Sequence, residues 1–144
     1  MILKKNIHYE KINDPIYKYR LLKDIEGWID FQHLMLDKPI HTEYCSLFTS
    51  GRIIGRKNYA WDGASGPTVD TTSSMHCSLD HDILWQLIEE GYLSKEWYPI
   101  SNDHLEDQGE KDGMWPIRAK LWNTSVTYFG RPFIRLKKWI FGRT

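Results

Sequence analysis

Apolar and polar residues follow two different rhythms along this chain, and the rhythm changes near its middle. Between residues 17 and 61, short stretches alternate between apolar and polar positions, which is typical of β-strands with one buried face. Between residues 72 and 130, apolar residues recur every three or four positions, as they do in α-helices packed on a core. Strands followed by helices predict an α+β fold, in which a small antiparallel sheet in the N-terminal half packs against three to four helices in the C-terminal half.

The strand half contains one clear hairpin. The pattern predicts short strands over residues 17–23 and 27–31, and a longer strand over residues 41–49. Ser50-Gly51 is a hairpin-type turn, after which residues 52–61 return as the partner strand. Residues 61–70 then read WDGASGPTVD, and their glycines and proline predict a shaped loop between the sheet and the helices.

The longest predicted helix, residues 72–91, carries apolar residues on two sides. One stripe contains Met75, Leu79, Ile83 and Leu87, and the other contains Cys77, Leu84 and Ile88. Such a helix is expected to pack on two sides, yet His81 falls within the second stripe and Asp82 beside the first. Because an unpaired buried carboxylate is costly, Asp82 is expected to have a partner: a network of donors, a cation or a metal ion.

Three further helices are predicted after this one. An acidic helix over residues 101–112 begins at the N-cap Ser101, and another over residues 116–130 begins with Pro116. A last short helix, residues 133–141, follows Pro132 and has basic residues around it. These cations could touch phosphate or a membrane surface. A solvated face, or a counterpart to the acidic helix, is the simpler interpretation.

Composition narrows the function classes. The 144 residues predict a single domain over 1–144, and 19 basic against 19 acidic residues create no overall field that would attract nucleic acid. No stretch approaches the roughly 20 apolar residues of a membrane span, and the N-terminus has no signal-peptide core. The chain is therefore expected in the cytoplasm. Cys45 and Cys77 are interpreted as reduced, packed thiols, with a disulfide between them as the alternative.

The candidate chemistry centres on His81 and Asp82. Neighbours on a helix point about 100° apart, so the two would serve one pocket from its two edges rather than pair with each other. Asp103 and Asp107 lie on the same predicted helix face as Ile100 and His104, and this face would bring carboxylates to the pair if it packs on the long helix. A histidine with two or three carboxylates is suited to a divalent metal ion or to general acid–base catalysis.

A structural interpretation competes with this one. Asp82 would accept backbone amides from the loop at residues 62–67, and His81 would donate to a carbonyl oxygen. The loop could also bring backbone amides to a ligand, which makes Ser65 a candidate binding residue. It lacks the spacing of a phosphate-binding loop, and Ser65 lacks the surroundings of a serine nucleophile.

The motifs resemble those of an uncharacterised family of small phage and prophage proteins, catalogued as a domain of unknown function. The matching pieces are residues 62–67 (DGASGP), residues 81–85 (HDILW), Asp103, and residues 128–130 (YFG). Trp85 departs from the family pattern, which more often has Tyr. The resemblance covers residues 17–130 and implies a phage or prophage origin and a compact α+β fold, but no established activity.

Two other likenesses are looser. A glycine-bearing loop followed by His-Asp on a helix resembles secreted phospholipase A2, but the dense disulfide framework of those enzymes is missing. The HD phosphohydrolase pattern can be matched with His41 or His76, then His81-Asp82 and Asp103. That family is all-helical, whereas the first half of this chain predicts strands.

Two hypotheses remain. The first is a hydrolase-like site with Asp62, His81, Asp82 and Asp103 as catalytic residues, and with Asp82, Asp103 and Asp107 as ligands of a divalent metal ion. The second is a non-catalytic phage protein, either a virion or tail component or an inhibitor of a host protein, located in the virion or the host cytoplasm. The enzyme hypothesis predicts an open cleft with a partly accessible His81, and the binding hypothesis predicts a buried, hydrogen-bonded pair and exposed aromatic residues elsewhere.

Overall fold

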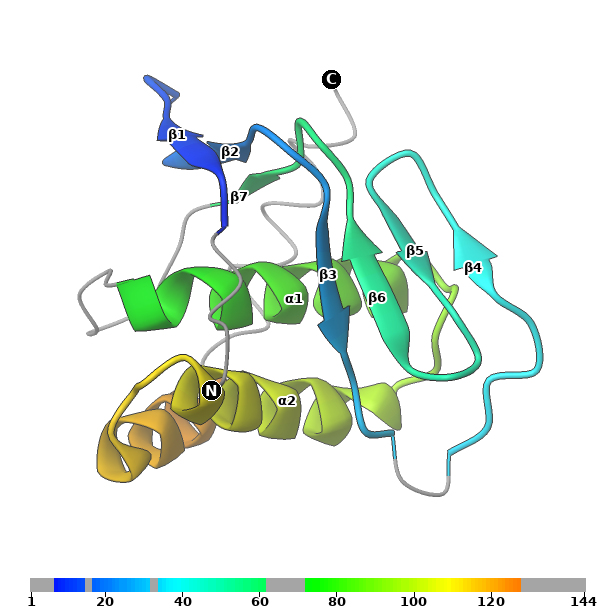
Figure 1. Ribbon diagram of the computed structural model, residues 1–144. Helices are drawn as coiled ribbons and strands as arrows, with labels where there is room; N and C mark the ends of the chain where they lie inside the picture. Colours follow the sequence, from blue (N-terminus) through cyan, green and yellow to red (C-terminus); the bar gives the residue numbers. More distant parts are fainter. Residues whose placement is uncertain (1–6, 15–16, 32–33, 62–71, 128–144) are drawn as a thin grey trace.

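The computed structural model describes residues 7–14, 17–31, 34–61 and 72–127, and it has the predicted α+β organisation (Figure 1). Strands fill the N-terminal half and helices the C-terminal half. The loop with Asp62 and Ser65, the end of the 116–130 helix and the basic segment at 133–141 lie outside the described residues.

The strands form two small antiparallel sheets rather than one. A three-stranded sheet has the order β1 (Tyr9–Lys11), β2 (Tyr19–Leu21), β7 (Ala60–Trp61). A four-stranded sheet has the order β3 (Ile25–Trp28), β6 (Arg52–Gly55), β5 (Cys45–Leu47), β4 (Ile40–His41). The predicted hairpin joins β5 to β6, and Gly51 adopts φ of 94° in its turn.

Local polar contacts break the two long predicted strands. The Thr42 hydroxyl accepts the backbone N–H groups of Tyr44 and Cys45 at 3.3 and 3.1 Å, which forms a turn between β4 and β5. Asn58 has a φ of 79° and donates its backbone N–H to Leu21, so the chain leaves β6 and starts β7 in the other sheet. The segments predicted as single strands over 41–49 and 52–61 are therefore each divided.

The described helices are α1 (Thr72–Glu89), α2 (Trp97–Lys111) and a third helix over residues 116–127, drawn in orange in Figure 1. The α1 helix matches its prediction, and Gly91 with φ of 87° follows its end. The α2 helix begins at Trp97 rather than at Ser101. Pro99 lies in its first turn and is tolerated there, because no backbone N–H is required at that position. None of the helices in the described part of the chain is both long and apolar enough to cross a membrane.

The α1 helix is the centre of the fold, and the two-sided burial predicted from its stripes is confirmed. It lies beside α2 along most of its length, and β6 packs on another side (Figure 1). Every residue from 74 to 88 is buried. A second, smaller core joins α1 and α2 to the third helix and contains Cys77, Leu105, Met114, Ala119, Trp122 and Val126. Cys45 and Cys77 are buried thiols that form no disulfide with each other, and burial raises the pKa of Cys45 to about 12.

Candidate functional site

A buried carboxylate between two imidazoles lies at the interface of α1 and α2. Asp80 Oδ2 is 2.9 Å from His104 Nε2 of α2 and 3.2 Å from His76 Nε2, one turn earlier on α1. A second carboxylate, Asp112 at the end of α2, lies 4.0 Å from His76 Nδ1. Burial alone would raise the pKa of Asp80, but the two imidazoles outweigh it and hold the pKa well below its usual range. This group, the His76–Asp80–His104 cluster, therefore contains an ionised carboxylate inside the protein.

The backbone of β3 covers this cluster closely. A Cβ atom added to Gly27 would come within 2.8 Å of Asp80 Oδ2 and 3.2 Å of His76 Nε2. Only a residue without a side chain allows the strand to lie so near the two polar groups. The cluster is thus enclosed by α1, α2 and β3, so its side chains are buried and are not accessible to a substrate.

His81 is held by a hydrogen bond to α2. Its Nε2 lies 2.8 Å from Asn102 Oδ1, and because an amide oxygen only accepts, His81 Nε2 carries the proton and donates it. The ring packs against Trp85, with 4.8 Å between the ring centroids. His81 is 4% exposed. The nitrogen that a general base would use on the α2 side is already engaged within the protein.

Asp82 lies close both to His81 and to Tyr59. It is 3% exposed, and its Oδ1 lies 3.7 Å from His81 Nδ1. Burial raises the pKa of Tyr59, and the nearby charge of Asp82 raises it further, so Asp82 is close to the strand side of α1. Neither His81 nor Asp82 lines the pocket described below. The two side chains approach each other, contrary to the prediction that these neighbours on a helix would not pair.

The carboxylates of α2 do not point toward α1 as the sequence predicted. Ile100 and His104 are buried against α1, but Asp103 and Asp107 are exposed. Among residues 7–14, 17–31, 34–61 and 72–127, no three or more His, Cys, Asp and Glu side chains are grouped so that they could hold a metal ion. The metal set of Asp82, Asp103 and Asp107 therefore stays a prediction from the sequence, without support from the described residues.

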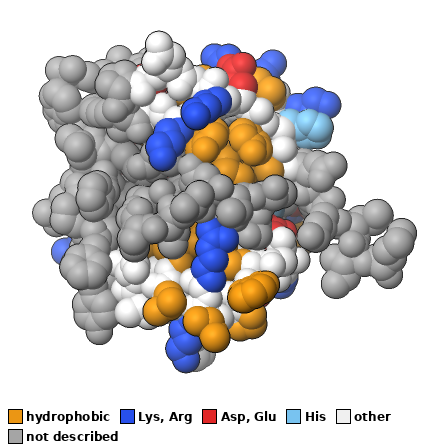
Figure 2. All heavy atoms as spheres, turned by 90° about the vertical axis from the view of Figure 1, so that its left-hand side faces the viewer, with side chains coloured by type: hydrophobic (Ala, Val, Ile, Leu, Met, Phe, Trp, Pro, Cys, Tyr) orange, Lys and Arg blue, Asp and Glu red, His pale blue; other side chains and the backbone are white. Residues whose placement is uncertain are grey.

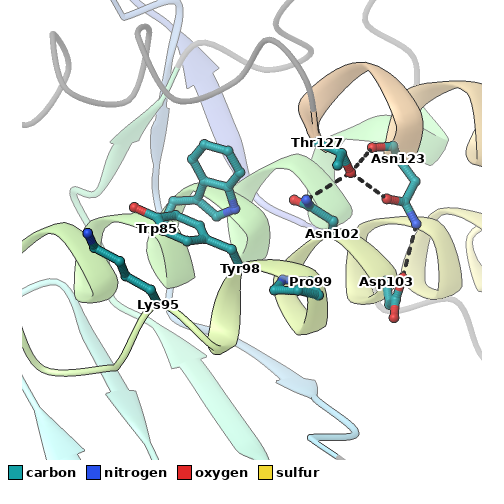
Figure 3. A pocket seen from close by; sticks show the side chains of 8 residues that line it. All are labelled: Trp85, Lys95, Tyr98, Pro99, Asn102, Asp103, Asn123 and Thr127. Atoms are coloured by element: carbon teal, nitrogen blue, oxygen red, sulfur yellow. Dashed lines mark hydrogen bonds between the residues drawn. The ribbon is translucent and has the colours of Figure 1, made fainter.

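A pocket of about 580 Å³ opens where α1, α2 and the third helix meet (Figure 3). Its lining residues are Trp85, Lys95, Tyr98, Pro99, Asn102, Asp103, Asn123 and Thr127. The volume lies within the range of small-ligand sites, which is about 300–1,000 Å³. Of the residues proposed from the sequence, Asp103 is the one that lines it. Asp62 and Ser65 lie outside the described residues.

A chain of hydrogen bonds crosses the wall of this pocket and connects it to His81. Asn102 Nδ2 donates to Thr127 Oγ1 at 3.1 Å, and Thr127 Oγ1 donates to the backbone carbonyl of Asn123 at 2.8 Å, with Asn123 Oδ1 also within reach at 3.3 Å. Asn123 Nδ2 then donates to Asp103 Oδ1 at 3.2 Å (Figure 3). Because Asn102 also accepts from His81, the buried histidine fixes the position of the pocket wall.

Sequence reasoning missed the most buried charged group of the site. Asp80 received no role, although its i,i+4 spacing from His76 was a signal that the two side chains share a helix face. The contribution of Asn102 carried no comparable signal, because its partners lie 21 and 25 residues away. Comparisons with protein-family models, with curated proteins and with solved structures found no match.

Proposed function

We propose that this protein acts by binding a partner and not by catalysis, and that the buried His and Asp residues of α1 form its structural polar core. The observation that carries the proposal is the geometry of His81: it is 4% exposed and its Nε2 donates to Asn102. A catalytic base needs access to its substrate, and the buried ring of His81, whose Nε2 is already bonded to α2, offers none. The motif resemblance to phage proteins suggests that the partner is a virion protein or a host protein.

Exposed apolar residues supply a surface for such a partner. Trp115, Ile117 and Leu121, at and near the start of the third helix, are 79%, 75% and 63% exposed. Figure 2 shows exposed hydrophobic side chains gathered low on its face, at the end of the molecule where the third helix lies in Figure 1. Ile117 and Leu121 are one helical turn apart and share a face. Exposed apolar side chains that gather in this way are typical of interaction sites.

This surface can be tested by copurification from bacterial cells. The wild-type protein is expected to retain a specific partner, and the double variant Ile117→Asp/Leu121→Asp is expected to lose it with an unchanged melting temperature. Met35→Asp is the matched control, because Met35 is another exposed apolar side chain, 82% exposed, outside the third helix. A partner that the double variant retains, or that Met35→Asp also loses, would contradict the assignment of this surface.

A hydrolase-like site is the second candidate, and one observation favours it: Asp103 lines the pocket and is connected to His81 through hydrogen bonds. Thermal melts of wild type and Asp82→Asn, with EDTA and then with Ca²⁺, Mg²⁺, Mn²⁺ or Zn²⁺, separate the two candidates. A structural core predicts that no ion changes the wild-type midpoint and that the variant melts lower. A rise of several degrees with one ion, absent in Asp82→Asn, would favour the metal-dependent hydrolase.

A further inference from the structure

The pocket between α1, α2 and the third helix has opposite charges at its two ends. Figure 3 shows Lys95 on one side and Asp103 on the other, with aromatic side chains between them. Lys95 precedes α2 and Asp103 lies within it, eight positions further along the chain, and a helical rise over eight positions is roughly 12 Å. Within the described part of the chain, Lys95 forms no ion pair.

The other polar side chains of the pocket already form hydrogen bonds within the protein. Asn102 accepts from His81 and donates to Thr127, and Asn123 accepts from Thr127 and donates to Asp103. The ammonium group of Lys95 and the remaining acceptor sites of the Asp103 carboxylate are therefore the groups available to a ligand.

The middle of the pocket is apolar. Trp85, Tyr98 and Pro99 line it, and the Tyr98 hydroxyl is turned to Glu89, to which it donates at 2.6 Å. An apolar body with one charge at each end is the ligand that such a lining accommodates.

We propose that this pocket binds a short peptide with free ends, its carboxylate at Lys95 and its amino group at Asp103. A three-residue extended peptide spans at most about 11 Å, which is comparable to the helical rise between the positions of Lys95 and Asp103. Its central side chain packs against Tyr98 and the exposed Pro99. This site is separate from the exposed Ile117 and Leu121 surface, so it stands or falls independently of the partner proposed there.

The probe is the tripeptide alanyl-leucyl-alanine, compared with its N-acetylated and C-amidated forms, in NMR titrations that follow the Trp85 indole signal. The free peptide is expected to shift this signal in a saturable way. Lys95→Met should lower the affinity for the free peptide about tenfold but leave the affinity for the amidated form unchanged. Asp103→Asn should likewise lower the affinity for the free peptide about tenfold but leave the affinity for the acetylated form unchanged. Lys111→Met and Asp107→Asn are matched controls, since both residues are exposed on α2 and neither lines the pocket.

Three results would overturn the proposal. The first is the absence of saturation at peptide concentrations of about 1 mM or above. The second is equal affinity of the free and both blocked peptides, which would mean that the charged ends are not recognised. The third is an equal loss of affinity in the pocket variants and the matched control variants.

Discussion

Replacing Asp80 by asparagine is expected to lower the free energy of unfolding by about 3–5 kcal/mol. The substitution keeps the volume of the side chain but removes the charge at which His76 and His104 converge, 3.2 and 2.9 Å from the same oxygen. Because the cluster is buried, water cannot replace the lost interaction. In a thermal melt, the midpoint should fall by about 10 °C or more.

The control for this prediction is Asp107→Asn, which neutralises an exposed carboxylate on α2 and should change stability by less than about 0.5 kcal/mol. Urea titrations of wild type and both variants at neutral pH measure the difference. Equal stability of Asp80→Asn and Asp107→Asn would show that the cluster does not stabilise the fold.

The comparison of wild type with Asp80→Asn also predicts how the contribution of Asp80 to stability depends on pH. The pKa of Asp80 is lower in the folded protein than its ordinary value of 3.8. Its stabilising contribution is therefore complete above pH 3.8 and is lost as the pH falls from there toward the folded pKa. The stability difference between wild type and Asp80→Asn should be largest at neutral pH and should shrink below about pH 3.8.

Replacing Trp85 by alanine is expected to cost about 3–5 kcal/mol as well, for a different reason. Trp85 is 1% exposed and packs between the rings of His81 and Tyr98, with centroid distances of 4.8 and 4.9 Å. Its Nε1 donates to Ser101 Oγ at 2.6 Å. The variant would leave a large cavity beside His81 and would remove one wall of the pocket.

Trp115→Ala is the matched control for Trp85→Ala, because it removes the same side chain from a position that is 79% exposed. Its effect on the free energy of unfolding should stay within about 0.5 kcal/mol. Chemical denaturation followed by circular dichroism measures both variants. A similar loss of stability in the two would contradict the burial and packing of Trp85.

The sequence determined α1, from its first residue to the glycine that follows it, because helix length, stripe spacing and terminal glycine are local properties. The two-sided burial also followed from spacing alone, since Met75 and Cys77 belong to different stripes of the same helix. The hairpin at Gly51 was equally local. The α+β class followed from the order of the two rhythms along the chain.

The tertiary structure alone decided which side chains of α1 and α2 meet. Sequence reasoning placed Asp103 and His104 on one face, but only His104 faces α1, and it meets Asp80 across 24 positions of the chain. The start of α2 at Trp97 differs from the predicted N-cap at Ser101, because Pro99 obscures a helix in the sequence although a first turn accepts it. The rotation of a helix about its axis is set by the packing of its neighbours, and a spacing pattern does not contain that information.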